Sequence, residues 1–370
     1  MCSRDVPRVR LHQNGRQMSE NIPETCQAQD CTLDGDTGQK QLVAGVLSFD
    51  LNRLGLNERQ LTALSKALYV VEDSIHESDS DDLLYDAHVV SALLCGYAVR
   101  YRNVEFSTIS VEQFLQAKVI DPHTNKRVNG WRNAGKIDAL LKINGQTVLM
   151  DHKTTSESIE DEGYWSHLRI DGQASHYLIL LLQNGTPIDS ILWDVLKKPT
   201  IRQKQTESLN DFSNRLIEDC INVRPDYYFG RRIVPQLSDI ILAYAEDLPK
   251  IAKQMRSAID SSIAPPKSTG SCFMYNKRCK FLPLCTGEDQ ESNWIKKPKK
   301  HAELPDGADN YELLTHSRIR TFQACQRKHH YEYVAQLKHP DEPEDAALRF
   351  GTLWHLALET YMGHFKEGAC

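Results

Sequence analysis

Three charged residues lie close together on two neighbouring apolar segments of this chain. Asp138 stands early in the first segment (residues 136–143), Asp151 ends the second (146–151), and Lys153 follows two residues later. Burying charge in a protein interior costs free energy, so charges on such segments need a partner or a function. These three residues are therefore the first candidates for a chemical site.

The dipeptide Asn144-Gly145 separates the two segments. Asn-Gly between apolar runs is the strongest short-range signal for a two-residue β-hairpin turn. The segments are thus predicted to form adjacent antiparallel strands, with both aspartates near the same end of the hairpin.

Two carboxylates that converge there offer hard oxygen ligands, which suit Mg²⁺ or Mn²⁺. Lys153 points to the same face as Asp151 on an extended chain and could polarise a phosphoryl oxygen or orient a water molecule. The alternative is a hairpin whose charges are merely solvated on an outer edge. Further along, Gln173 and Tyr177 are spaced four residues apart, so they share one face of a predicted helix over 172–182.

Taken in order, these motifs resemble a known nuclease family. Gly135-x-x-Asp138, Asp151-His152-Lys153-Thr154-Thr155 and Gln173-x-x-x-Tyr177 are similar to the core of the RecB-type PD-(D/E)xK nucleases. The segment Asp194-Val-Leu-Lys-Lys-Pro-Thr200 resembles the one that follows this helix in phage-type members. The resemblance implies that both aspartates hold a divalent metal, that Lys153 assists the attacking water, and that Gln173 and Tyr177 face DNA.

The resemblance also implies a fold. We expect an α/β protein with a restriction-endonuclease-like core, in which a mixed central sheet is flanked by helices, with helical additions. Hydrophobic content of 40% and charged content of 25% are typical of a globular protein that can build such a core.

Composition divides the chain into four parts. Residues 1–55 are polar and aperiodic and are predicted to be disordered or loosely attached. Residues 56–285 hold the predicted nuclease core with a cysteine-rich end, 286–310 have the composition of a linker, and 311–370 return to helical periodicity.

Cys272, Cys279 and Cys285 cluster in a polar, basic segment, and Cys325 follows the predicted linker. Spacing alone leaves open scattered buried cysteines or a zinc site with a fourth ligand. The segment around Cys325 resembles the opening helix of iron–sulfur nucleases of the same superfamily. That resemblance implies a 4Fe-4S cluster held by all four cysteines, although the six residues between Cys272 and Cys279 are more than many members have.

The segment around His355 is similar to the first motif of the family, with the run Gly351-Thr-x-x-His355-x-x-x-Glu359. A lone histidine on an apolar helix is usually a packed core residue, but the resemblance implies that His355 is a metal ligand. In relatives the two helices predicted around Cys325 and His355 come first, whereas here they come last. The chain is then a circular permutant, a joined tail and truncated head of two copies, or a rearranged reading frame; we favour a permutant with a complete site.

The net charge of −6 gives no overall attraction to nucleic acid, so DNA contacts require local basic patches. The candidates are Lys197, Lys198, Arg327 and Lys328. Tyr164, Trp165 and Tyr177 could stack on unpaired bases, although Trp165 fits a core position equally well. No signal peptide or apolar run of membrane-spanning length is visible, which predicts a cytoplasmic protein without a membrane partner.

The sequence therefore predicts a Mg²⁺- or Mn²⁺-dependent DNA nuclease, specifically an exonuclease, that acts on single strands or DNA ends. The family further implies roles in replication, recombination or repair, with a helicase or recombination partner. The alternative is a non-catalytic DNA-binding or scaffold protein that keeps a rearranged nuclease fold.

Overall fold

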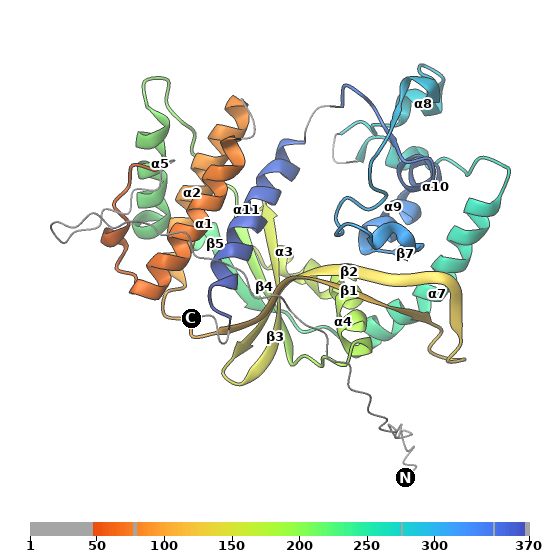
Figure 1. Cartoon of the computed structure of the whole chain (residues 1–370), viewed down its shortest axis with the longest axis horizontal. Helices are drawn as coiled ribbons and strands as arrows, with labels where there is room; N and C mark the ends of the chain where they lie inside the picture. Colours follow the sequence, from red (N-terminus) through yellow and green to blue (C-terminus); the bar gives the residue numbers. More distant parts are fainter. Residues whose placement is uncertain (1–46, 77–79, 275–276, 343–344, 367–370) are drawn as a thin grey trace, which may run out of the picture. The chain divides into compact units, whose positions relative to one another are not determined.

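A computed structural model describes residues 47–76, 80–274, 277–342 and 345–366. Its centre is a mixed sheet in the order β1-β2-β3-β4-β5, shown in Figure 1. Those strands span Ser107–Ile120, Arg127–Ile143, Gln146–Thr155, Ser190–Lys197 and Phe229–Ile233. β3 and β4 run parallel, whereas the β1–β2, β2–β3 and β4–β5 pairs are antiparallel. The predicted fold class, a mixed sheet flanked by helices, is confirmed.

The predicted hairpin joins β2 to β3. Asn144 and Gly145 both have positive φ angles, 49° and 79°, as a type I′ turn requires. From this turn the strands pair from Ile143↔Gln146 to Ala139↔Met150. Beyond that pair they diverge, because β2 stays paired with β1 while β3 stays paired with β4.

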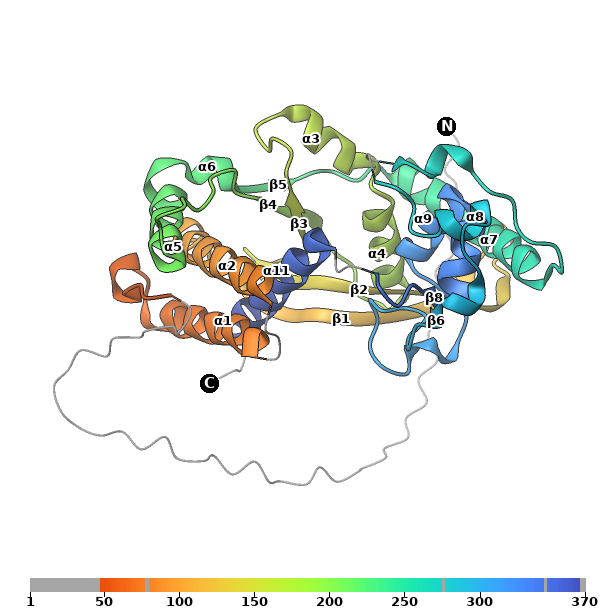
Figure 2. The ribbon, with the colours of Figure 1, turned by 90° about the horizontal axis from the view of Figure 1, so that it is seen from above.

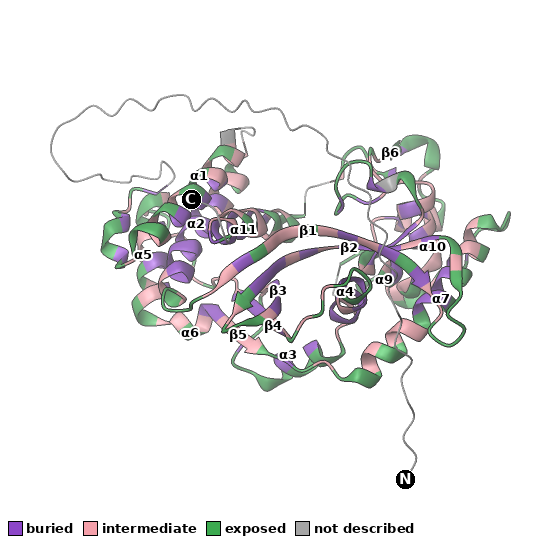
Figure 3. Cartoon of the chain, turned by 60° about the horizontal axis from the view of Figure 1, so that its bottom comes forward, coloured by how far each residue is buried: buried purple, intermediate pink, exposed green. Residues whose placement is uncertain are grey.

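Side chains that alternate along the strands supply two separate cores. Ala139, Leu141 and Met150 face a core built with helices α1 (Glu58–His76), α2 (Asp81–Arg100), α5 (Leu209–Glu218) and α11 (Ala346–Gly363). Leu140 and Leu149 face the opposite core, with α3 (Glu162–His167) and α4 (Gly172–Gln183). Figure 2 shows α1, α2 and α11 beside one another on the first side, and α4 on the other. Figure 3 shows buried residues concentrated on the central strands and on α2.

α2 is the helix, among the described residues, that is long and apolar enough to span a membrane. Of its most apolar window, 67% is buried inside the protein. Ala87 through Ala98 are all buried, so α2 is accounted for as a core helix.

The C-terminal segment packs onto the sheet at two places. β7 (Leu313–Leu314) pairs in parallel with β2 at Arg132 and Asn133, on the part of β2 that β3 has left. α11 then crosses the first face of the sheet, contacting α1, α2, β1 and β2. Trp354 of α11 is 1% exposed, and its ring lies edge-on to Tyr97 of α2 at 5.6 Å between centroids.

The remaining elements pack around these layers. α7 (Ser238–Asp260) lies against the far half of β1 and β2, and α9 (His316–Ala324) is followed at once by α10 (Gln326–His329). The short elements are α6 (Pro225–Tyr228), α8 (Leu282–Thr286), β6 (Ile295–Lys296) and β8 (Leu337–Lys338), of which the last two pair with each other.

One boundary predicted from composition is wrong. Residues 1–55 were expected to be loosely attached; residues 1–46 lie outside the described part of the chain. Leu47, Leu51 and Leu54 are buried in the first core, and Leu51–Leu54 form a short 3₁₀ helix capped by the Asp50 side chain. The leucines are spaced three or four apart, a periodicity that the polar residues around them conceal in a composition profile.

The docking of α11 can be tested by core truncation. Trp354→Ala is expected to lower the free energy of unfolding by about 3–5 kcal/mol, because it leaves a cavity between α11 and α2. Leu348→Ala removes a side chain of the same helix that is 71% exposed; it should cost less than about 0.5 kcal/mol. Denaturant unfolding followed by circular dichroism measures both. Equally small effects would show that α11 is not part of the core.

Candidate active site

Asp138 lies where β2 and β3 diverge, one residue past their last pair. At this point the main-chain N–H of His152 has no partner on β2, and it donates instead to Asp138 Oδ2 at 2.7 Å. This hydrogen bond fixes the Asp138 carboxylate at the mouth of the opening between the strands.

Glu112 of β1 lies opposite Asp138, since Val111 pairs with Ala139 and Gln113 with Ile137. Its φ of 46° is in the left-handed region, which is uncommon for a residue with a side chain and costs about 1–3 kcal/mol. The Glu112 carboxylate forms ion pairs with Lys136 and with His355. A strained backbone that holds a partly buried carboxylate against other charges is typical of a functional site.

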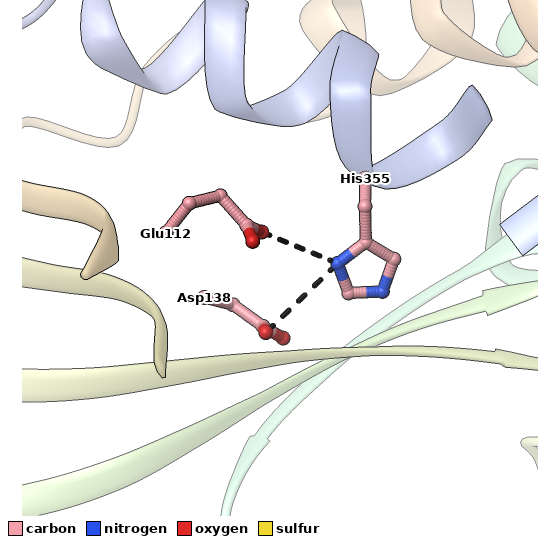
Figure 4. A group of neighbouring side chains, drawn as sticks. All are labelled: Glu112, Asp138 and His355. Carbon is pink, nitrogen blue, oxygen red and sulfur yellow. Dashed lines mark ion pairs between the residues drawn. The ribbon is translucent and has the colours of Figure 1, made fainter. Parts of the chain in front are cut away.

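His355 reaches these two carboxylates from α11, as Figure 4 shows. Its Nδ1 atom lies 3.5 Å from Glu112 Oε1 and 3.9 Å from Asp138 Oδ1. One ligand atom from each of the three residues lies within 4.8 Å of the others, and all three side chains are partly buried. Two carboxylates and an imidazole are a donor set that fits Mn²⁺ or Mg²⁺.

Asp151 and Lys153 lie beside this group on β3. Lys153 Nζ is 2.6 Å from Asp151 Oδ2 and donates to Gln173 Oε1, also at 2.6 Å. Gln173 Nε2 in turn donates to the Tyr177 hydroxyl at 2.9 Å. The two helix residues therefore hold the lysine ammonium in place from α4. Gly135 permits this, because a Cβ there would lie 2.9 Å from the Tyr177 ring.

Charges within the group shift several pKa values. Burial alone would lower the pKa of His355, but its hydrogen bond to Glu112 and the charge of Asp138 outweigh burial and raise it. Burial likewise acts to raise the pKa of Glu112, and hydrogen bonds from His355 and Lys136 bring it below its usual value. Each shift favours the charged form of its group, so His355 and Glu112 stabilise each other as an ion pair.

Asp151 is only 2% exposed, and its burial dominates its titration. Burial raises the pKa of this carboxyl to about 6, although the neighbouring Lys153 charge acts to lower it. Lys153 shows the converse: burial acts to lower its pKa, and the carboxylates of Asp151 and Asp171 raise it. The pair therefore stays ionised at neutral pH and becomes protonated on Asp151 in mild acid.

The structure brings together Asp138 and His355 with Glu112, and Asp151 with Lys153, Gln173 and Tyr177. Glu112 was missed because it is one acidic residue in an otherwise ordinary strand. The signal that could have found it is register: a strand paired antiparallel with β2 must place some residue opposite Asp138, and an acidic one there would add a ligand.

Cys272, Cys279, Cys285 and Cys325 line one cavity, away from the carboxylates. The main-chain N–H groups of Ser268 and Lys328 donate to Cys325 Sγ at 3.4 and 3.5 Å. None of the four cysteines forms a disulfide. Among the described residues, no three of these sulfurs approach one another as closely as the ligand atoms around Glu112 do.

The four predicted DNA-binding residues fall in two places. Lys197 pairs with Thr155 at the end of β4, and its Nζ lies 3.9 Å from the centroid of the Tyr227 ring; Lys198 lies over Phe350. Arg327 donates to the Pro265 carbonyl, and Lys328 lines the cysteine cavity. Of these four residues, only Lys197 and Lys198 are near Lys153, because β4 pairs with β3 and Lys197 lies opposite Thr155.

The suggestion that aromatic side chains stack on bases is wrong for this structure. Tyr164, Trp165 and Tyr177 are 8%, 3% and 7% exposed and belong to the core beneath α4. The Trp165 indole donates to the Ile159 carbonyl inside that core. A sequence pattern near a site does not distinguish an aromatic ring that lines the site from one that supports it.

Comparison with known proteins identifies the class to which this fold and site belong. The chain matches the family model of the PD-(D/E)XK nuclease superfamily over residues 45–286 and 313–369, and it belongs to that superfamily. Both the main part of the chain and the C-terminal segment that carries His355 fall within the match.

Among solved structures, the chain is similar to the crystal structure of SSO0001, with 16% sequence identity over 51% of this chain and 74% of that chain and a TM-score of 0.24. No curated protein sequence matches the chain. Superfamily membership implies a metal-dependent nuclease with DNA as its substrate.

The raised pKa of Asp151 predicts how metal binding depends on pH. Without metal, ionisation of the buried Asp151 carboxyl destabilises the folded protein. Its pKa is 3.8 in the unfolded chain and about 6 in the folded protein, so this loss of stability develops as the pH rises from 3.8 to about 6. A metal held by Asp151 would require the ionised carboxylate, so protons would compete with it below about pH 6, and the raised pKa of His355 would make protons compete there too. We expect Mn²⁺ to raise the melting temperature strongly at pH 8 and only slightly at pH 5. An equal rise at both pH values would contradict this assignment, and Asp151→Asn should flatten the pH dependence.

Proposed function

We propose that this protein hydrolyses DNA phosphodiester bonds with Mg²⁺ or Mn²⁺ held by Asp138, Asp151 and His355, and that Glu112 completes the ligand set. The observation that carries the proposal is the convergence of His355, from the last helix, on the carboxylate at the opening between β2 and β3. An imidazole brought from the far end of the chain onto two carboxylates is not explained by packing alone.

The bound metal would lower the pKa of a water molecule and stabilise negative charge on the phosphate. Lys153 would orient that water or neutralise the developing charge. Gln173 accepts a hydrogen bond from Lys153 Nζ and so directs it, and the Tyr177 hydroxyl holds Gln173 in turn. These three side chains form one connected path from α4 to β3.

We further propose that the chain is a circular permutant. Its C-terminal helices then supply the part of the site that stands at the beginning of the nuclease domain in relatives. Two contacts support this. β7 adds to β2 where β3 has left it, and α11 buries Trp354 in the same core as α2. The C-terminal segment is thus integrated into the sheet and the core, and the site does not depend on a second chain for His355.

The preferred substrate is proposed to be single-stranded DNA or a DNA end, processed by exonucleolytic cleavage in repair, recombination or replication. We propose that Lys197 and Lys198, at the end of β4, contact a phosphate near Lys153; the pairing of Lys197 with Thr155 of β3 supports this. Comparing cleavage of single-stranded, blunt and circular DNA distinguishes these substrates, and cleavage of closed circles would overturn the requirement for an end.

Asp138→Asn tests the catalytic assignment. This substitution should abolish Mn²⁺-dependent DNA cleavage, and Lys153→Met should lower kcat by about 10²–10³-fold, while both variants keep the fold. Lys142→Met is the control, because it removes an exposed lysine from the same β2 strand, beside the hairpin turn. DNA binding without cleavage in the wild type would instead favour a non-catalytic DNA-binding or scaffold protein.

For the cysteine cavity we propose a 4Fe-4S cluster rather than zinc. A tetrahedral zinc site with bonds of about 2.3 Å would place sulfurs roughly 3.8 Å apart. Among the described residues, no three of these sulfurs all lie within 4.8 Å of one another, which is wider than a single tetrahedral zinc ion requires. The two main-chain N–H groups that donate to Cys325 Sγ are the kind of contact that tunes a cluster.

Cys325→Ser tests the cluster. The purified wild type is expected to be brown and to contain roughly four irons per chain, and the variant should lose both the colour and the iron. Cys220→Ala is the matched control, because Cys220 is a free cysteine buried in the core near α2 and should leave the iron content unchanged. Stoichiometric zinc without visible absorbance would contradict the proposal.

A further inference from the structure

A buried charged network lies directly behind the carboxylates of the candidate active site. At its centre is Asp194 of β4, which is 4% exposed and accepts hydrogen bonds from three side chains. The donors are His152 Nδ1 at 2.7 Å, the Tyr97 hydroxyl at 2.7 Å, and Arg231 Nε at 2.6 Å. Arg231 also donates to the Tyr97 oxygen, which closes the network.

Strand register explains why these residues meet. His152 of β3 lies beside Asp194 of β4, and Asp194 lies opposite Arg231 of β5. Because side chains alternate along a strand, this row points to the face opposite that of Asp151 and Lys153. The motif Asp151-His152-Lys153 therefore divides between the two faces: its charged ends meet α4, and its histidine faces α2 and α11.

His152 contacts two residues of the proposed metal site, His355 and Asp138. Its ring lies edge-on to the His355 ring, with 6.0 Å between centroids and an interplanar angle of 84°. Its main-chain N–H donates to Asp138 Oδ2. A carboxylate can only accept, so Asp194 requires the proton of the His152 imidazole to be on Nδ1, and this bond fixes the ring plane.

Burying such a charged network costs free energy, so its presence indicates a function beyond packing. Burying a carboxylate and a guanidinium costs several kcal/mol per ion before their attraction is counted, and apolar residues could fill the same space. Burial acts to raise the pKa of Asp194, yet the Arg231 charge and the His152 hydrogen bond hold it well below its usual value. Asp194 thus remains an anion over the whole working range of pH.

We propose that Asp194 is a positioning residue for the metal site, which it controls through His152. Asp194 fixes the His152 imidazole, and His152 in turn supports the His355 ring from behind while its main chain holds Asp138. This inference rests on the proposed metal site at Asp138 and His355. It assigns a role to Asp194, the first residue of the segment Asp194-Val-Leu-Lys-Lys-Pro-Thr200.

Two substitutions at His152 each remove a different part of this mechanism. His152→Phe keeps a ring beside His355 but removes the donor to Asp194. His152→Asn keeps a donor near the Nδ1 position but removes the ring. Because loss of a residue that orients a metal ligand typically weakens metal binding by about 10–100-fold, we expect both variants to lower Mn²⁺ affinity by about tenfold or more.

His88→Phe is the matched control. His88 is another buried histidine of the same core, and its Nδ1 lies 3.0 Å from Ser213 Oγ, but it does not contact the site. It should lower thermal stability as the His152 variants do and leave Mn²⁺ affinity unchanged. Isothermal titration of the full-length protein with Mn²⁺ measures affinity independently of cleavage.

The outcomes separate this inference from the function on which it rests. If the wild type does not bind Mn²⁺, or if Asp138→Asn binds it equally well, the metal site itself is wrong. If Asp138→Asn loses binding while both His152 variants bind like the wild type, the positioning role alone is overturned. Should the His152 variants not fold, Tyr97→Phe removes one donor to Asp194 and keeps the ring; it should weaken Mn²⁺ binding by about threefold, and unchanged affinity would also overturn the role.

Discussion

The structure depends on the divergence of β2 and β3 after the pair Ala139↔Met150. Up to that pair, the ladder satisfies the main-chain groups of both strands. Beyond it they lose each other as partners, and groups at the point of divergence must find new ones. The His152 N–H finds the Asp138 carboxylate, so the loss of strand pairing itself creates the place where a charged side chain is held.

The C-terminal segment completes the structure around that opening. β7 replaces β3 as the neighbour of β2, and α11 covers the first face of the sheet and places His355 over Asp138 and Glu112. The order of segments along the chain matters little for such a site, because helices and strands packed on one core can be joined by different connections. What matters is that Trp354 and its neighbours bury enough apolar surface to hold α11 in one position.

Much of the local structure could be predicted from the sequence. Asn144-Gly145 has the positive φ angles that a type I′ turn needs, and Gln173 and Tyr177 share a helix face and a hydrogen bond. Each of these predictions rests on neighbours in sequence. Glu112 could not be found in this way, because its role depends on strand register and on a positive φ angle that no local pattern required. Trp165 was ambiguous for a related reason, since burial is decided by elements distant in the chain.

The sequence by itself determined the superfamily, the hairpin that carries Asp138 and Asp151, and the helix that holds Lys153 through Gln173. These features follow from turn chemistry and side-chain periodicity, which act over a few residues. Only the tertiary structure decided that His355 meets Asp138, that Glu112 joins them, and that Asp194 anchors His152 from behind. Those contacts join residues far apart in the chain, and they form because burial of apolar surface, not any local preference, brings their strands and helices together.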